Sequence, residues 1–262
     1  MSLDEFAAFR CDAPLDTALF FYHVPKTAGT TVEAVLHALA TERGRTLRLV
    51  PRAVGMRERP PPAGFFEDER PLAYAGHCWF GAHRWVGRPV HACTVLREPV
   101  ERVVSEYLWR NANRNRAASA DDFRHYLDNL ALSNLATRLL AGESEIDWRS
   151  VDRAIAHLGS CFLVGRTERL APFLSAILSL YGGPSVRTRP AKQQRDPRKA
   201  QLIEMFGDEI ARRNAYDRTL YDYAEAHLFG RADALLRGFS EPAPRRVQVD
   251  NPNGKQFVVR DD

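Results

Sequence analysis

Short apolar segments alternate with amphipathic segments along most of this chain, and this alternation restricts the fold more than any other feature. Apolar runs of strand length occupy residues 18–24, 72–80, 91–96 and 161–165. Helical spacing of apolar residues follows at 30–40, 99–110, 122–141 (broken near Leu132), 150–158, 168–181, 198–212 and 215–228. Strands that alternate with helices predict an α/β fold with a mostly parallel central sheet flanked by helices.

The length of 262 residues suits one domain around a single large core. No internal repeat and no linker divides the chain, so we expect a domain over residues 1–240, its first 15 or so residues peripheral. Residues 241–262, with three prolines and many charges, are expected to form a peripheral tail. Residues 51–71, rich in Pro and Arg, and the polar residues 111–122 are expected to form loops.

Composition argues against several other classes of protein. The net charge is +4, but the 33 acidic residues are interleaved with scattered arginines, so we expect no nucleic-acid partner. No apolar stretch approaches the roughly 20 residues needed to span a bilayer, and the acidic N-terminus is unlike a secretory signal. None of the four cysteines lies within CxxC spacing of another. We expect a soluble, cytoplasmic protein whose cysteines are small buried hydrophobes.

The turn after the first strand is the first candidate binding site. It reads Val-Pro-Lys-Thr-Ala-Gly-Thr-Thr over residues 24–31 and leads into a helix, whose N-terminus attracts anions. The residues that would form this phosphate site are Lys26, Thr27, Ala28, Gly29, Thr30 and Thr31. The lysine precedes the only glycine, so the turn matches neither a Walker A motif nor G-x-G-x-x-G. An ordinary turn with a helix cap is the alternative.

A second candidate segment begins where the third strand ends. Arg97 stands at that end, and Ser105 lies eight residues on, about two turns into the helix that Pro99 opens. The planar guanidinium donates two parallel hydrogen bonds to a phosphate, although Arg97 pairing with a nearby carboxylate is the alternative. Arg102 is flanked by glutamates at helical spacing, so we expect it to be structural.

Together, these segments resemble the sulfotransferase superfamily. Residues 21–31 are similar to its 5′-phosphosulfate-binding loop, and residues 94–107 to its 3′-phosphate-binding segment, R-[DE]-P-x-x-R with a later Ser. The branch resembled contains heparan sulfate 2-O-sulfotransferases and bacterial relatives. Weaker similarities lie at 76–77, 134–142, 163–168 and 220–224. The resemblance spans residues 18 to 228 and implies a P-loop-like sulfotransferase fold.

The resemblance also implies a reaction. The donor would be 3′-phosphoadenosine-5′-phosphosulfate (PAPS), and its sulfuryl group would pass by in-line displacement to a hydroxyl, leaving 3′,5′-adenosine bisphosphate (PAP). Lys26 would contact the phosphosulfate bridge and residues 27–31 the 5′-phosphate, while Arg97 and Ser105 would hold the 3′-phosphate. The acceptor would be a carbohydrate or another small molecule in a bacterial setting. The departing group carries a single charge, so no metal is expected.

Histidine is the expected general base. His77 stands near the end of the second strand, its imidazole titrates near neutrality, and the resembled branch uses a histidine in that strand. His83 is the second candidate. The residues proposed to contact the acceptor are His83, Trp79, Asn134 and Arg138, for which core packing or a helix surface is the alternative. We expect His23 to be a packed histidine and Glu33 a solvated or capping carboxylate.

Two other functions remain open on the sequence. A P-loop type of nucleotide-dependent phosphotransferase would share the architecture, but the Walker lysine and a magnesium carboxylate are not in place. A non-catalytic protein that binds nucleotides or polyanions would keep the pocket without turnover.

Overall fold

The computed structural model describes residues 17–50, 65–66, 71–114, 119–129, 132–181, 197–238, 248–250 and 256–258. The strands are β1 (Ala18–Tyr22), β2 (Leu47–Leu49), β3 (Ala73–Gly76), β4 (Val90–Leu96), β5 (Leu163–Arg166), β6 (Gln248–Asp250) and β7 (Gln256–Val258). The helices are α2 (Gly29–Glu42), α3 (Pro99–Asn113), α4 (Ala120–Leu127), α5 (Leu135–Ala141), α6 (Trp148–Ser160), α7 (Ala171–Leu180), α8 (Pro197–Arg213), α9 (Ala215–His227) and α10 (Gly230–Gly238). A short 3-10 helix, η2, spans Ala82–Trp85.

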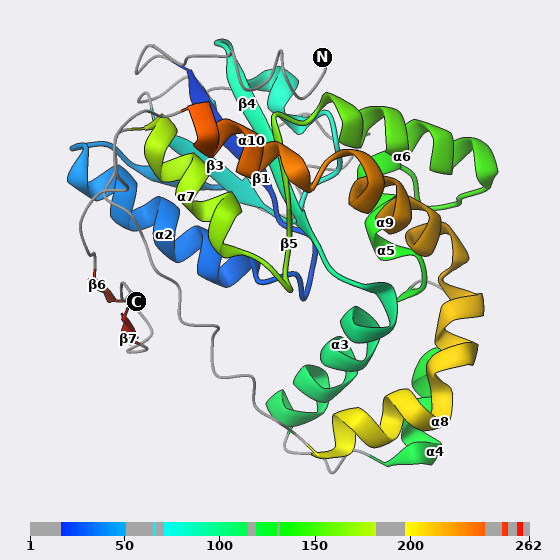
Figure 1. Cartoon of the computed structure of the whole chain (residues 1–262). Helices are drawn as coiled ribbons and strands as arrows, with labels where there is room; N and C mark the ends of the chain where they lie inside the picture. The colour runs from blue at the N-terminus through cyan, green and yellow to red at the C-terminus, as the bar shows by residue number, and fades with distance from the viewer. Residues whose placement is uncertain are drawn as a thin grey trace.

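Five strands form one sheet in the order β2-β3-β1-β4-β5, and every neighbouring pair is parallel (Figure 1). This confirms the predicted α/β class with a parallel sheet. The chain leaves β1 toward β2 and β3 on one side and later returns to β4 and β5 on the other, so a topological switch point lies at β1. Tyr22 is in register with Gly76 and Thr94, which brings the segments that follow β1, β3 and β4 to one edge. Ligands of open α/β sheets bind at such an edge.

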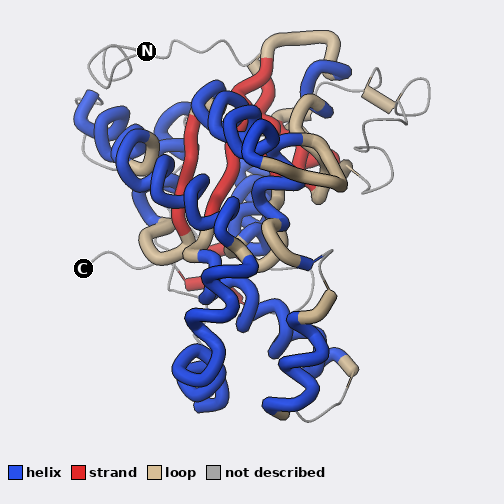
Figure 2. The backbone as a smooth tube through the Cα atoms, turned by 90° about the vertical axis from the view of Figure 1, so that its right-hand side faces the viewer, coloured by secondary structure: helices blue, strands red, loops and turns tan. Residues whose placement is uncertain are grey.

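Helices cover both faces of this sheet, as Figures 1 and 2 show. Side chains alternate along β1: Leu19 and Phe21 pack with residues of α2, α7 and α10, whereas Phe20 and Tyr22 pack with residues of α5, α6 and α9. All four are almost completely buried. Both faces of β1 are therefore apolar, which explains its nearly continuous hydrophobic run.

A hydrophobic cluster separate from those on the two faces of the sheet holds α3, α4 and α8 together (Figure 2). Val104 of α3 and Phe123 of α4 are completely buried there, and Phe206 of α8 is 4% exposed. The helix that follows β4 is thus anchored to a second layer of helices. The cluster fixes which face of α3 is turned toward the carboxyl edge of the sheet.

The structure differs from the sequence expectations at several elements. β2 and α10 were not predicted, because β2 is only three residues long with no buried position, and α10 begins and ends at glycines. The helical region expected over 122–141 is broken near Leu132, as expected, into α4 and α5, whereas α3 extends through Asn113 into the expected loop. Within the tail, β6 and β7 pair antiparallel. No helix in the described ranges is long and apolar enough to cross a membrane.

Candidate anion-binding site

The turn after β1 has an unusual backbone. Lys26 and Ala28 have φ angles of 67° and 63°, and Thr27 between them has a negative φ. Residues with side chains adopt the left-handed region at a cost of roughly 1–2 kcal/mol each, so surrounding contacts must hold this shape. The buried Thr27 hydroxyl donates to Val24 O at 2.7 Å. Left-handed residues are a feature of anion-binding nests, in which successive N–H groups point toward a common point, and we interpret residues 26–28 as a candidate nest.

Gly29, the first residue of α2, is required by packing. A Cβ at this position would lie 2.0 Å from ring atoms of His23. His23 is buried, as predicted, and its Nδ1 lies 2.7 Å from Glu33 Oε1, so Glu33 has a partner that the sequence did not predict. The cap residue Ala28 offers no side-chain hydrogen bond to the helix. The first N–H groups of α2 therefore have no capping side chain.

Lys26 occupies a partly buried position beside this turn. Its Nζ lies 5.0 Å from the centroid of the Trp109 ring on α3, a cation–π arrangement. Burial lowers the pKa of Lys26, the nearby Arg97 lowers it further, and Glu106 acts in the opposite direction. The lysine is thus a partly desolvated cation, and an anion placed beside it is attracted more strongly than by a solvated lysine.

Arg97 reaches the turn from the end of β4. Its Nη1 donates to Lys26 O at 3.3 Å, and its Nη2 donates to Glu101 Oε2 at 3.0 Å. The side chain is 16% exposed. The two predicted segments, 71 residues apart, therefore lie in direct contact. The alternative expected from the sequence, pairing with a neighbouring carboxylate, is also present in the contact with Glu101.

Ser105 lies on the face of α3 that is turned toward these cations. Glu101, Ser105 and Trp109 follow one another at intervals of four residues, so they share one face of the helix. Glu101 contacts Arg97, and Trp109 contacts Lys26. Ser105 stands between these two contacts. We call the turn 24–28 together with Lys26, Arg97 and this face of α3 the cationic site.

The residues after Arg97 start α3. Glu98 is the N-cap, and its side chain accepts from Glu101 N at 2.8 Å, while Pro99 occupies the first turn. Glu98 N in turn donates to Glu168 Oε1 at 3.2 Å. Glu168 also accepts from Tyr221 at 3.2 Å, which joins β5 and α9 to the start of α3. The R-E-P sequence thus places an arginine at the strand end and begins a helix directly after it.

His77 lies just beyond β3, at the same edge of the sheet. Its Nδ1 is 2.6 Å from His23 O, and the two imidazole rings are 4.1 Å apart between centroids. A carbonyl oxygen only accepts, so Nδ1 carries the proton and the lone pair of the neutral ring lies on Nε2. The backbone of the turn therefore selects the tautomer of His77 in which Nε2 can accept a proton.

His83 has a structural environment. The Tyr22 hydroxyl accepts from Gly81 N and His83 N, both at 3.1 Å, and lies 2.5 Å from His83 Nδ1. With both N–H donors directed at it, the hydroxyl donates its own proton to Nδ1. Burial lowers the pKa of His83, with Arg84 as the second cause. Its expected role as a base or acceptor contact gains no support. Trp79 is partly buried and packs against the hydrophobic cluster that contains Tyr22.

Asn134 lies in a pair of reciprocal helix caps. Its Oδ1 accepts from Tyr216 N and Asp217 N, at 3.0 and 3.1 Å, in the first turn of α9. Asp217 in turn accepts from Thr137 N at 2.8 Å and from Ala136 N at 3.2 Å in the first turn of α5. Asn134 has a φ of 50° and is 8% exposed. Its side chain therefore joins α5 and α9, which is a structural role, and the acceptor contact stays a prediction.

Arg102 completes this polar interior. It is 1% exposed and donates to Glu106 Oε2 at 2.8 Å, and its Nε lies 4.0 Å from Asp217 Oδ2. The prediction that Arg102 is structural is therefore confirmed. We call Arg102, Glu106, Asn134, Thr137 and Asp217 the buried polar cluster. Arg138, the remaining predicted contact, donates from Nε to Ser133 O at 3.0 Å.

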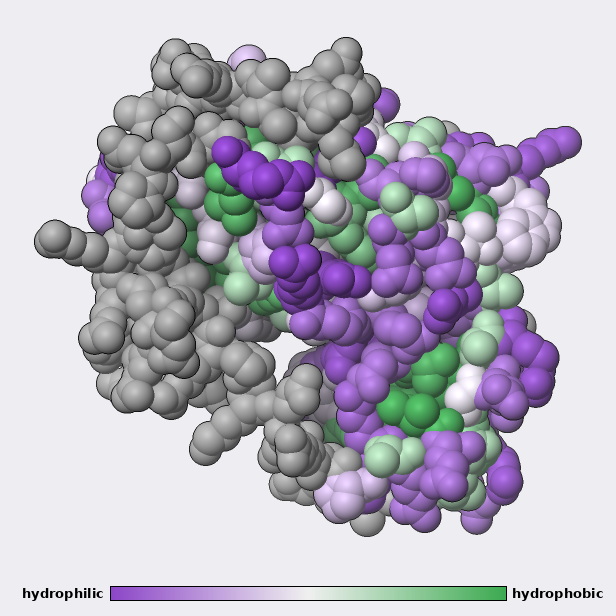
Figure 3. Space-filling model, viewed as in Figure 1, coloured by the Kyte–Doolittle hydropathy of each residue, from purple (hydrophilic) through white to green (hydrophobic). Residues whose placement is uncertain are grey.

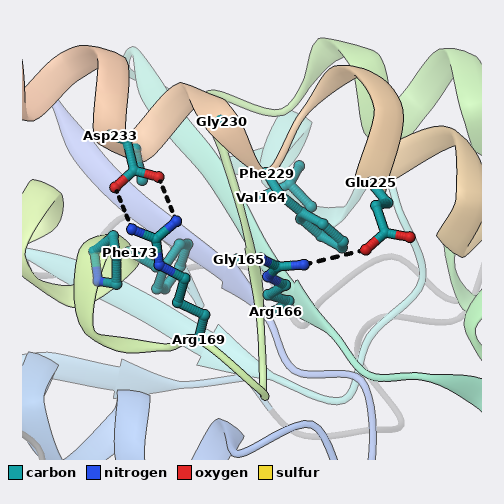
Figure 4. Close-up of a pocket in the computed structure, with 11 residues that line it drawn as sticks. Val164, Gly165, Arg166, Arg169, Phe173, Glu225, Phe229, Gly230 and Asp233 are labelled. Carbon is teal, nitrogen blue, oxygen red and sulfur yellow. Dashed lines mark hydrogen bonds and ion pairs between the residues drawn. The ribbon is translucent and has the colours of Figure 1, made fainter.

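A separate cavity of about 320 Å³ lies against the edge strand β5, beneath α10 (Figure 4). Two ion pairs line it: Arg166 with Glu225 at 3.2 Å, and Arg169 with Asp233 at 3.1 Å. Each cation there has a carboxylate partner, and none of the predicted site residues lines the cavity. Because its cations are paired, this cavity is less suited to bind an anion than the cationic site is.

Figure 3 shows how polarity is distributed on one face of the molecule. Hydrophilic residues form a band across the middle, over the region where β4 and β5 end and α3 begins. A hydrophobic patch lies below it, between α3 and α8. In the described ranges, no group of three His, Cys, Asp or Glu residues is placed to hold a metal ion. Cys78, Cys93 and Cys161 are free and buried, as expected.

Comparison with known proteins gives distant structural likenesses and no match in sequence. No protein-family model matches the chain, and no curated protein matches it. The structure is similar to a crystal structure described as a sulfotransferase from Alicyclobacillus acidocaldarius, with 15% sequence identity and a TM-score of 0.40. The similar region covers 78% of this chain and 97% of that chain. At this identity and TM-score we base no inference on the likeness.

Proposed function

We propose that this protein is a PAPS-dependent sulfotransferase of the branch that contains heparan sulfate 2-O-sulfotransferases and bacterial relatives. One observation supports this most: the two segments that resemble the 5′- and 3′-phosphate motifs lie in contact, with Arg97 donating to Lys26 O at 3.3 Å. A nucleotide phosphorylated at both ends requires two anion sites a short distance apart, and the cationic site offers cations from both segments. Separate surfaces for the two segments would have left the proposal without a binding site.

The chemistry of the cationic site fits each part of the donor. The nest at Lys26–Ala28 and the N-terminus of α2 suit the 5′-phosphate, because both direct N–H groups at an anion. Arg97 and Ser105, a guanidinium and a hydroxyl on neighbouring elements, suit the 3′-phosphate. The backbone strain at Lys26 and Ala28 also supports a binding role for this turn, since strained residues cluster at functional sites.

The donor supplies an electrophilic sulfur and a phosphate leaving group. The acceptor oxygen forms a bond to sulfur while the bond between sulfur and the bridging phosphate oxygen breaks, and the acceptor proton passes to His77 Nε2. Lys26 stabilises the charge that develops on the departing phosphate. Because His23 O holds Nδ1 of His77 at 2.6 Å, the imidazole is oriented as a base before the acceptor arrives.

The finer parts of the proposal concern the acceptor and the setting. We propose that the acceptor is a hydroxyl of a carbohydrate, glycoconjugate or other small molecule, and that the protein acts in the bacterial cytoplasm without a metal. These parts rest on the sequence resemblance.

Calorimetric titration with PAP tests the function without an acceptor. We expect one PAP per chain and clearly weaker binding of 5′-AMP, which lacks the 3′-phosphate. Equal or tighter binding of ATP with magnesium would favour a phosphotransferase instead. PAP binding without sulfuryl transfer from PAPS to any tested acceptor would favour a non-catalytic binder, and no PAP binding would overturn the proposal.

A further inference from the structure

Glu101 lies between two cations at the edge of the cationic site. Its Oε2 accepts from Arg97 Nη2 at 3.0 Å and also contacts Lys199 Nζ. Lys199 comes from the first turn of α8, about 100 residues later in the chain, and neither sequence motif includes it. The three side chains are 16%, 33% and 27% exposed for Arg97, Glu101 and Lys199 respectively, so their mutual attraction is only partly screened by solvent.

The carboxylate of Glu101 thus occupies cations that would otherwise face an incoming anion. The neighbouring carboxylates have other tasks: Glu98 caps α3 and lies 3.5 Å from Arg218, and Glu106 is bound to Arg102 and Arg110. Glu101 is therefore the described carboxylate that contacts both Arg97 and Lys199. It carries one negative charge, whereas a phosphate monoester carries about −1.5 to −2 at pH 7 and has three acceptor oxygens.

We propose that Lys199 is a further binding residue for the 3′-phosphate and that Glu101 is an internal competitor for the same cations. The 3′-phosphate displaces the Glu101 carboxylate and takes hydrogen bonds from Arg97 and Lys199 together. An incoming anion must displace the Glu101 carboxylate, so an anion with lower charge or fewer acceptor oxygens binds more weakly. The site therefore selects nucleotides that carry a 3′-phosphate. This inference rests on the proposed function, since it assigns the 3′-phosphate to the Arg97 side of the cationic site.

The test compares the affinities of PAP and 5′-AMP, which differ by the 3′-phosphate alone. Lys199→Ala should weaken PAP binding by roughly 10-fold, the value of one charge-assisted hydrogen bond, and leave 5′-AMP binding unchanged. Glu101→Gln keeps the shape but removes the charge, and it should tighten PAP binding by roughly 5-fold through the loss of a like charge beside the phosphate. Arg212→Ala, on the exposed far end of α8, is the matched control for one lost cation and should change neither affinity.

The outcomes separate this inference from the proposed function. If the wild-type protein fails to bind PAP, both are overturned. If it binds PAP but Lys199→Ala behaves as Arg212→Ala does, the inference alone is overturned. Weaker PAP binding by Glu101→Gln would mean that Glu101 positions Arg97 rather than competing with the phosphate, and would also overturn the inference.

Discussion

Two arginines five residues apart in the same motif, Arg97 and Arg102, have opposite surroundings. Arg97 is at the carboxyl edge of the sheet and retains solvent contact, with one hydrogen bond to a backbone carbonyl and one to Glu101. Arg102 is buried, with Glu106, Asp217 and a backbone carbonyl around it. The first therefore faces the edge where a ligand can enter, and the second joins α3 to α9 and to the segment that precedes α5. One R-E-P-x-x-R motif thus serves both the site and the fold.

The balance of charge explains why the buried polar cluster stabilises the fold, whereas the cationic site is suited to bind a ligand. In the buried polar cluster, the cation of Arg102 lies against the carboxylates of Glu106 and Asp217, and Arg110 pairs with Glu106 from the surface. Burial demands this balance, because an unpaired charge in the interior is costly. In the cationic site, by contrast, Arg97 and Lys199 share the single carboxylate of Glu101. The carboxylate that acts on Lys26 is Glu106, which already pairs with Arg102 and Arg110. An excess of cations at a solvent-accessible edge is suited to bind an anion.

The largest effect should come from the buried region. Arg102→Ala leaves Glu106 and Asp217 without their buried cation, and the free energy of unfolding should fall by roughly 3–5 kcal/mol. Arg124→Ala is the matched control, because its ion pair with Asp121 is exposed, and it should cost less than about 0.5 kcal/mol. Urea unfolding measures both. Similar values for the two variants would remove the distinction between the regions.

Lys26→Ala should have the next largest effect, on turnover. Loss of the cation beside the leaving phosphate should lower the rate of PAPS desulfation by roughly 10²–10³-fold. Because burial and Arg97 lower the pKa of Lys26, the wild-type protein should lose this cation as the pH rises through a value below that of an ordinary lysine, and activity should decline on the alkaline side. Lys26→Arg stays charged there and serves as the control. An unchanged rate in Lys26→Ala would contradict the assignment.

His77→Ala should have a smaller effect, confined to transfer. Without a base, sulfuryl transfer to a hydroxyl acceptor should slow by roughly 10²-fold, while the affinity for PAP stays the same. His83→Ala, which alters a histidine bound to Tyr22, is the comparison. A normal rate at saturating acceptor would exclude His77 as the base.

The sequence predicted the contact between the two segments but not the residues around them. The resemblance implied that both segments hold one nucleotide, and ligands of parallel sheets bind where the strands end, so Lys26 and Arg97 were expected at one site. Trp109 and Lys199 were missed because they reach the site from 83 and 173 residues beyond Lys26 in the chain. Only the spacing of Trp109, four residues after Ser105, hinted at a shared face. The structural role of Asn134 was not predicted, because its partner, Asp217, lies on a distant helix that no local pattern connects to it.

Arg97→Ala should have the smallest of these effects and bears most directly on the comparison. Loss of the guanidinium should weaken PAP binding by roughly 10–50-fold, the value of its charge-assisted hydrogen bonds, and change 5′-AMP binding little. Stability should hardly change, because Arg97 keeps solvent contact and Glu101 retains Lys199 as a partner. Calorimetry with both nucleotides and thermal unfolding give the two readouts. A large loss of stability with unchanged PAP affinity would show that Arg97, like Arg102, serves the fold.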